Sequence, residues 1–208
     1  AVLLAAAALW LPSIVVRGLT LHYLEQAGMQ ATIGDVDVNI VTGTVVYDDI
    51  QASAAEGEQV AIGRLALSLA YAPLLSKRLV LEHLAIENGA FDIHRDRDNT
   101  LRVGGYPIGA SDSQTTSLDW GIALQHVVLR GLRVHYSQPA NGQQRAIDRE
   151  LVLNDSNARD VVSWQQNNDV PMDADMSVGD SHIRISGRVT PFGDRISGHF
   201  ELVTERFA

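Results

Sequence analysis

The sequence contains no cysteine and only one lysine. These two features limit the kinds of covalent cross-link, metal site and binding partner that the chain can have. Without cysteine there is neither a disulfide nor a thiolate metal site, although this does not locate the protein in an oxidising or a reducing compartment. The 16 basic residues stand against 25 acidic ones, for a net charge of -9, and no stretch is dense in Lys or Arg. This balance argues against nucleic acid as a partner. A content of 46% hydrophobic and 20% charged residues is typical of a folded chain.

The amino-terminal stretch AVLLAAAALWLPSIVV, residues 1–16, carries no charge. Its sixteen residues fall short of a hydrocarbon core roughly 30 Å thick, but a few more would complete a span. SIVVRGLTLHYLEQ offers no clean cleavage site for a signal peptidase. We therefore expect residues 1–28 to be a partial transmembrane anchor that continues into a helix ending near Gly28.

The charges that follow the apolar stretch predict the orientation of this anchor. No Lys or Arg occurs between Arg17 and Arg64, whereas the same interval contains Glu25, Asp35, Asp37, Asp48, Asp49, Glu56 and Glu58. Positive residues stay on the cytoplasmic side of a membrane, so the following chain is expected outside. In a bacterium with two membranes this predicts an inner-membrane protein with the bulk of its chain in the periplasm.

After Gly28 the pattern changes to the alternation typical of β-strands. ATIGDVDVNI predicts a strand with Ile33, Asp35, Asp37 and Asn39 on one side and Val36, Val38 and Ile40 on the other. TGTVVYDDIQAS follows a turn and predicts its hairpin partner, and VAIGRLALSLAY places its large side chains on one face. PLLSKR interrupts the alternation with Pro73 and the pair Lys77-Arg78, which indicates a solvated bend.

An internal repeat follows this bend. LVLEHLAIENGAFDIH, residues 79–94, and IALQHVVLRGLRVHY, residues 122–136, share a Glu or Gln before His, flanking apolar alternation, a Gly and a second strand, with one residue fewer in the second copy. The alternation slips by one residue at Glu82-His83, as at a bulge. A repeat of this size predicts stacked strand units in an elongated sheet. Residues 104–117 and 137–150 have turn-rich composition and no regular period.

Several short stretches resemble catalytic or metal-binding motifs, but each lacks a residue that the motif requires. Gly179-Asp180-Ser181 resembles a lipase block but has no Asp-x-x-His partner near the end of the chain, and His94-Arg95-Asp96 lacks the Asn of a kinase loop. Asp96, Asp98 and Thr100 lack the glycine of a calcium loop, so a solvated turn is preferred. His83 and His126 occupy equivalent repeat positions, but zinc needs three or four ligands, which favours polar residues at a register slip. No catalytic residue, metal site or cofactor is expected.

The repeated apolar faces leave two architectures open. They fit a sandwich core of two packed sheets, and they fit equally a single curved sheet whose concave face forms an open trough. Alternation alone does not separate the two, because both produce it.

Residues 1 to about 100 resemble the amino-terminal region of the AsmA-like family, the TamB- and YdbH-type proteins of the bacterial envelope. The similarity consists of the anchor with LEQAGMQATIGDVDV, then TGTVVYDDIQAS, and then the distinctive run VAIGRLALSLAYAPLLSKRLVLEHLAIENGAFDIHRD. The tail IRISGRVTPFGDRISGHFEL is similar to later strand units of such proteins, and residues 104–170 match nothing in them. The resemblance implies a mainly β fold: an N-terminal membrane anchor helix followed by a repeated, elongated, curved antiparallel sheet that forms a β-groove with an apolar lining.

This fold divides the chain into residues 1–28 as anchor and helix, 29–103 as the first β-groove unit, 104–170 as a second β unit with long loops, and 171–208 as C-terminal strands of a sheet expected to continue. The resemblance implies phospholipid transport between membranes or support of outer-membrane assembly, with phospholipid acyl chains and envelope proteins as partners. The alternation assigns the groove lining to Leu65, Leu67, Leu69, Leu81, Leu84, Ile86, Phe91, Ile93, Leu124, Val127, Leu129, Leu132 and Val134. Two alternatives stay open: a periplasmic scaffold of packed sheets that binds proteins at a sheet edge, and an envelope hydrolase.

Overall fold

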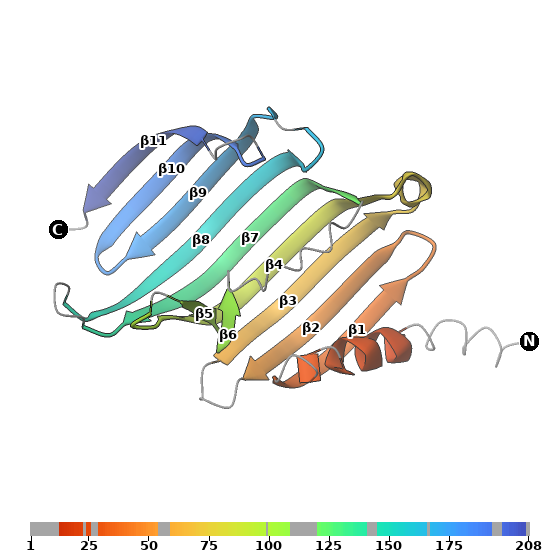
Figure 1. Cartoon of the computed structure of the whole chain (residues 1–208), viewed down its shortest axis with the longest axis horizontal. Helices are drawn as coiled ribbons and strands as arrows, with labels where there is room; N and C mark the ends of the chain where they lie inside the picture. The colour runs from red at the N-terminus through yellow and green to blue at the C-terminus, as the bar shows by residue number, and fades with distance from the viewer. Residues whose placement is uncertain are drawn as a thin grey trace, which may run out of the picture.

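The computed structural model describes residues 13–22, 24–25, 29–53, 59–98, 100–108, 120–140, 145–165, 167–192 and 197–206. The fold is mainly β, and the strands formed by these described residues all belong to one sheet (Figure 1). The strands are β1 (Gln30–Asn39), β2 (Thr44–Ser53), β3 (Gln59–Ala70), β4 (Arg78–Arg95), β5 (Leu101–Val103), β6 (Tyr106–Ile108), β7 (Gly121–Gln138), β8 (Ile147–Val162), β9 (Val170–Val178), β10 (Ser181–Thr190) and β11 (Ser197–Arg206). A 3-10 helix, η1 (Ala72–Ser76), joins β3 to β4.

The sheet is mixed, which corrects the expectation of a purely antiparallel one. Its order is β1-β2-β3-β4-β7-β8-β9-β10-β11, and β4 and β7 pair in parallel whereas the other neighbours are antiparallel. Parallel neighbours need a long crossover connection, and residues 96–120 provide it. Part of this connection is the β5–β6 hairpin, so the expectation of no strand in residues 104–117 is wrong for Tyr106–Ile108. The same expectation for residues 137–150 is wrong for the start of β8 at Ile147.

The two copies of the internal repeat are β4 and β7. Leu79 pairs with Ile122, Leu84 with Val127 and Phe91 with Val134, so the offset between the copies is constant. The one-residue gap in the sequence alignment is therefore wrong. The alignment with the gap matched Gly89 to Gly131, whereas the residue opposite Gly131 in the sheet is Asn88. Asn88 and Gly131 both have left-handed backbones, with φ of 56° and 60° respectively. Asn is one of the few residues besides Gly that tolerate this conformation.

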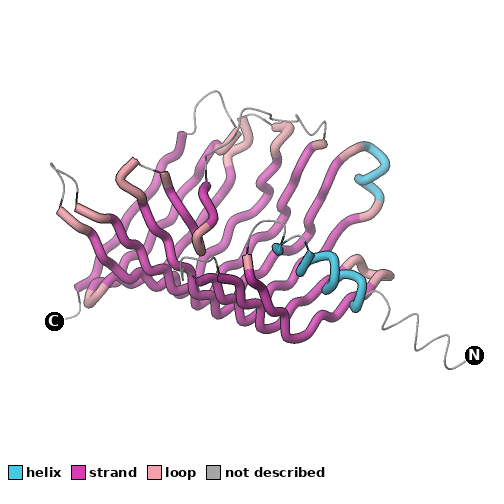
Figure 2. Tube along the Cα trace, turned by 60° about the horizontal axis from the view of Figure 1, so that its bottom comes forward, coloured by secondary structure: helices cyan, strands magenta, loops and turns pink. Residues whose placement is uncertain are grey.

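The sheet bends along a line that crosses β1 to β8. At this level the regular pairing is interrupted at Gly34 and Asp49, at Gly63 and Asn88, at Gly131, and beside Asn154. The strands approach closely here: a Cβ on Gly34 would lie 3.0 Å from the Asp48 carbonyl oxygen, and one on Gly63 would lie 3.0 Å from the Asn88 Cβ. Figure 2 shows the resulting curved, trough-like sheet.

The bend also changes which side chains share a face. Ile33 and Val36, three residues apart on β1, belong to the same buried cluster with Tyr47 and Ile50 of β2. The strict alternation predicted for residues 31–40 is therefore wrong, because the irregularity at Gly34 shifts its phase by one residue. Large apolar residues thus stay on the same face on both sides of the bend line. We call this the concave face and the opposite one the convex face.

A helix formed by residues 13–22 and 24–25 lies on the concave face at the β1–β2 end of the sheet (Figure 2). Val16 and Leu21 pack against the cluster around Ile33, and the Thr20 hydroxyl lies 3.1 Å from the Tyr47 hydroxyl. The described residues contain no helix that combines the length and the hydrophobicity of a membrane span. Residues 1–12 and 26–28 of the expected anchor lie outside the described residues.

Candidate functional site

The concave face brings together all thirteen residues predicted to line a groove. They form cross-strand rows in which directly paired residues share the face, such as Leu67, Leu84 and Val127. The other rows are Leu69, Leu81 and Leu124; Leu65, Ile86 and Leu129; and Phe91 with Val134, while Ile93 pairs with Tyr136 and Leu132 with Leu153. The structure therefore places these side chains as one continuous wall across β3, β4 and β7.

This wall is neither sealed nor fully solvated. Leu132 is 6% exposed, whereas the other twelve residues are only partly buried. The most buried large side chains lie elsewhere: Ile33 under the helix and Val170 at the start of β9, each 2% exposed. Among the described residues there is no second sheet over the concave face. The packed sandwich is therefore not the architecture of this part of the chain.

The concave face extends beyond the residues that the sequence pattern identified. By cross-strand pairing it continues over β8 to β11. These additional residues include Leu151, Leu153, Ala158, Met172, Met176, Ile183, Ile185, Phe200 and Leu202. The strand β8 has polar residues around its bulge at Asn154, which removed the alternation that could have revealed it.

Aromatic rings cover glycines at two places on this face. A Cβ on Gly89 would lie 2.7 Å from the Phe91 ring and 2.9 Å from the Leu132 side chain. A Cβ on Gly187 would lie 2.7 Å from the Phe200 ring of the neighbouring strand. The glycines therefore let large side chains lie flat against the sheet, which keeps the wall apolar but shallow.

The convex face carries a row of charges beside the bend, one residue per strand in direct register. The row runs through Asp48, Arg64, Glu87, Arg130, Asp155, Asp175 and Arg184. Its ion pairs are Arg64–Asp48 at 3.8 Å, Arg130–Glu87 at 3.6 Å, Arg130–Asp155 at 3.0 Å and Arg184–Asp175 at 3.7 Å. Opposite charges on paired strands stabilise one register, whereas Asp155 and Asp175 are like charges in direct register. The row makes the convex face polar beside the bend.

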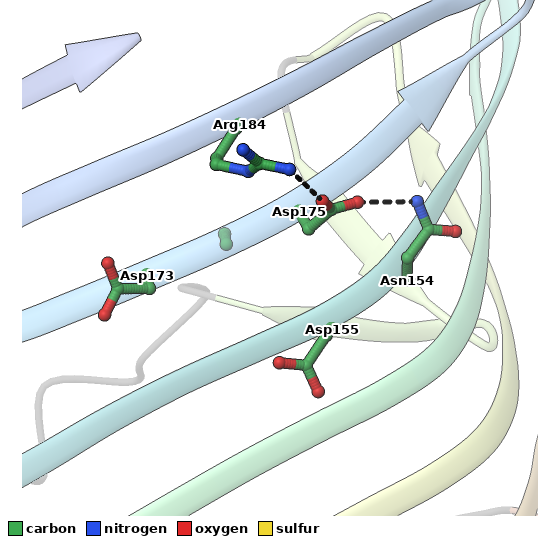
Figure 3. A pocket seen from close by; sticks show the side chains of 6 residues that line it. Asn154, Asp155, Asp173, Asp175 and Arg184 are labelled. Carbon is green, nitrogen blue, oxygen red and sulfur yellow. Dashed lines mark hydrogen bonds and ion pairs between the residues drawn. The ribbon is translucent and has the colours of Figure 1, made fainter. Parts of the chain in front are cut away.

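At the β8–β10 end of the row, polar side chains line a hollow (Figure 3). The Asn154 amide donates to Asp175 at 2.9 Å, and His182 lies 2.7 Å from the same carboxylate. Hydrogen bonds from Asn154 and then His182 lower the pKa of Asp175. The Asp175 carboxylate is therefore hydrogen-bonded within the hollow, and the described residues contain no cluster of three or more side chains suited to a metal.

The register slip predicted at Glu82-His83 is confirmed, and the two repeat histidines contact each other there. His83 and His126 stack edge to face with ring centroids 5.4 Å apart, and the β3–β4 register shifts at Ser68, which pairs with His83. No third metal-binding side chain joins them within the described residues. Lys77, with a left-handed φ of 53°, ends η1, and Arg78 begins β4, so the basic pair does mark a bend.

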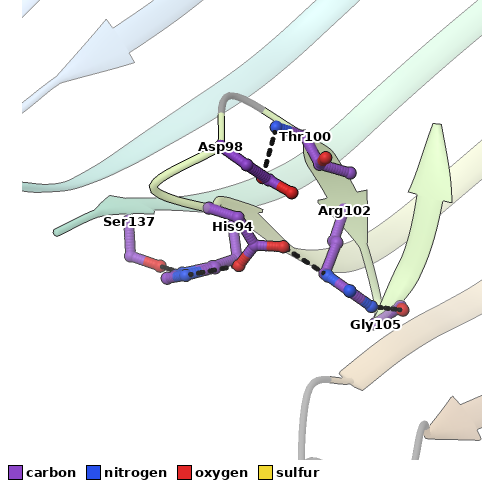
Figure 4. Close-up of polar contacts among 7 residues, drawn as sticks. His94, Asp98, Thr100, Arg102, Gly105 and Ser137 are labelled. Atoms are coloured by element: carbon purple, nitrogen blue, oxygen red, sulfur yellow. Dashed lines mark hydrogen bonds and ion pairs between the residues drawn. The ribbon is translucent and has the colours of Figure 1, made fainter. Parts of the chain in front are cut away.

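A Ser-His-Asp contact lies at the end of β4 (Figure 4). The Ser137 hydroxyl is 2.9 Å from His94 Nδ1, and His94 Nε2 is 3.4 Å from Asp96. The order of ring nitrogens is the reverse of that in serine hydrolases, and Arg102 binds Asp96 at 2.7 Å. The Asp96 carboxylate is therefore shared between His94 and Arg102. Asp98, whose pKa is lowered by the backbone N–H of Thr100, lies in the expected exposed turn.

Comparison with models of known protein families and with curated protein sequences finds no match for this chain.

Proposed function

We propose that the concave face binds phospholipid acyl chains and that the protein supports phospholipid transport between bacterial membranes or outer-membrane assembly. One observation carries the proposal: a contiguous row of half-buried Leu, Ile, Val and Phe side chains spans a single curved sheet. In the described residues no second sheet covers this row, and the helix covers only its β1–β2 end. Apolar surface of this extent meets lipid, a partner or another sheet in stable proteins. The resemblance to AsmA-like proteins favours lipid among these.

The arrangement of the rows is better suited to an acyl chain that slides along the concave face than to one held at a fixed site. Each methylene removed from water contributes about 0.8 kcal/mol. The rows Leu65–Ile86–Leu129 and Leu67–Leu84–Val127 offer an acyl chain nearly the same surroundings one step apart. A bound chain therefore gains free energy at each step without a single deep site, and this proposal requires no catalytic residue.

The same proposal places the protein at the inner membrane, with the sheet in the periplasm and the amino-terminal segment as the anchor. The interval from Arg17 to Arg64, which has acidic residues and no Lys or Arg between its ends, supports that orientation.

A scaffold that binds a protein strand is the second candidate. Within the described residues β11 pairs only with β10, so its other edge is open, and Leu202 and Val203 on it are 58% and 46% exposed. An open edge with exposed apolar side chains is suited to strand addition.

Binding of a fluorescent fatty acid to the delipidated protein tests the proposal. Leu84→Glu and Leu67→Glu place a carboxylate in the middle of the wall and should abolish binding while the far-ultraviolet circular dichroism stays unchanged. Ala90→Glu is the matched control, because Ala90 is exposed on β4 and its neighbour Phe91 lies on the concave face, so the new charge points away.

Two results would contradict the proposal. Unchanged probe binding by folded Leu67→Glu and Leu84→Glu variants would show that the wall is not the binding surface. Unfolding of both variants, with Ala90→Glu intact, would indicate that the leucines are sealed in a core. Mass spectrometry of lipids extracted from the purified protein identifies the natural ligand.

A further inference from the structure

The two long edges of the curved sheet differ in their exposed apolar side chains and in their charge. The ends of β1, β3, β8 and β10 and the starts of β2, β4, β7, β9 and β11 all lie along this edge, together with η1 (Figure 1). We call its described residues, 39–44, 70–78, 120–122, 162–165, 167–170 and 190–192, the apolar rim. The opposite edge contains the turns around residues 96–98 and 179–180 and the start of β8.

Exposed large hydrophobic side chains concentrate on the apolar rim. Val41 and Leu75, at the tips of the β1–β2 turn and of η1, are 92% and 93% exposed. The others on this rim are Ile40, Tyr71, Trp120, Ile122, Trp164 and Phe192, all at least 37% exposed. Along the opposite edge the only such residue among those described is Ile147.

Specific contacts fix the positions of several exposed side chains on the rim. The Tyr71 hydroxyl donates to the Ile40 carbonyl at 2.6 Å, which ties η1 to the β1–β2 turn. Arg78 stacks on the Trp164 ring at 4.8 Å, and the ring lies against Gly121. The rim is therefore a fixed line of aromatic and aliphatic groups.

The charge of the rim is opposite to that of the protein. Its described residues include Lys77, which is the only lysine of the chain, and Arg78, both exposed. Its one acid is Asp169, which accepts a hydrogen bond from Thr190 at 2.7 Å. The described charges of the opposite edge balance, because the acids Asp96, Asp98, Asp148, Glu150 and Asp180 are accompanied by Arg95, Arg97, Arg102, Arg145 and Arg149. In a chain of net charge -9, the described residues of this rim combine exposed apolar tips with an excess of one positive charge.

We propose that the apolar rim rests on the surface of an anionic phospholipid bilayer. Trp and Tyr gather at membrane interfaces because their rings are apolar and their N–H and O–H groups stay hydrated. Val41 and Leu75 reach the acyl region, while Lys77 and Arg78 meet the phosphates. A protein partner would bury such tips in pockets, whereas a bilayer accepts protruding aliphatic side chains without shape complementarity. This membrane contact is separate from the amino-terminal segment and does not depend on lipid binding by the concave face.

The absence of cysteine allows a site-specific test. Val41→Cys, Leu75→Cys and Ile147→Cys each give one thiol, to which the environment-sensitive dye NBD is attached. All three positions are exposed, so labelling leaves the fold intact, and Ile147 is the matched control on the opposite edge. The full chain is mixed with protein-free vesicles of equal parts phosphatidylethanolamine and phosphatidylglycerol.

Dye at positions 41 and 75 should brighten severalfold and shift to shorter wavelength, with little change at position 147. Lys77→Gln or vesicles without phosphatidylglycerol should weaken the response. Equal responses at all three positions, or none at 41 and 75 while the protein still sediments with the vesicles, would overturn the proposal. So would a response that needs a protein extract of the cell envelope. Because the labels lie outside the concave face, fatty acid binding succeeds or fails independently.

Discussion

Asn88 on β4 and Gly131 on β7 lie opposite each other at the bend of the sheet, and both have left-handed backbones. A Cβ added to Gly131 would lie 3.1 Å from the Asn88 side-chain oxygen. The bend thus depends on two adjacent residues that tolerate an uncommon conformation, in the middle of the wall proposed to hold lipid.

Gly131→Val should therefore destabilise the protein, because a β-branched residue with positive φ is strained. We expect a loss of about 1–3 kcal/mol in the free energy of unfolding, measured by urea denaturation. Gly131→Asn is the control, since Asn88 shows that Asn is accepted at this level of the sheet, and it should cost much less. Equal stability of Gly131→Val and the parent protein would show that the bend does not need the left-handed residue.

The helix on the concave face gives a second prediction. Leu21 packs on the cluster of Ile33, Val36, Tyr47 and Ile50, so Leu21→Glu should detach the helix. The amides of residues 13–22 should then exchange hydrogen much faster, as measured by mass spectrometry. Leu19 is 65% exposed on the same helix, and Leu19→Glu should leave the exchange unchanged. Equal exchange in both variants would show that this packing does not hold the helix.

The apolar wall could be predicted from the sequence because Leu65, Leu67 and Leu69 alternate in phase on a strand without interruption. Parallel pairing of β4 and β7 could not, since parallel and antiparallel strands have the same side-chain period. The bend could not be predicted from the sequence for a related reason. An irregular residue such as Gly34 reverses the phase of all that follows it, so Ile33 and Val36 were assigned to opposite faces. The apolar rim could not be predicted either, because Val41, Leu75 and Trp164 lie far apart in the sequence. Only the strand order of the sheet brings their turns to one edge.

The contact between Gly121 and Trp164 leads to a third prediction. A Cβ on Gly121 would overlap the indole ring of Trp164, which must then move. Gly121→Ala should displace Trp164 from Arg78, change the tryptophan emission and reduce stability by about 1–3 kcal/mol. Gly18→Ala is the control, because nothing lies within 4 Å of its added Cβ and Ala favours a helix. An unchanged emission spectrum and unchanged stability of Gly121→Ala would contradict the close contact.

His135 on the convex face should titrate abnormally. Its Nε2 lies 2.9 Å from Asp148 and its Nδ1 lies 3.5 Å from Asp92, and the hydrogen bond to Asp148 is the main reason that the pKa of His135 is raised. The folded state therefore favours the protonated ring. This stabilisation is complete below the unfolded pKa of about 6.5 and is lost as the pH rises through the higher folded pKa. Because the side chain is 48% exposed, the effect on stability is small, and NMR titration of the ring protons is the better measurement. Asp148→Asn should lower the midpoint of His135, whereas Asp173→Asn, which removes a carboxylate on β9, should not. An unchanged midpoint in Asp148→Asn would show that the ion pair does not form in solution.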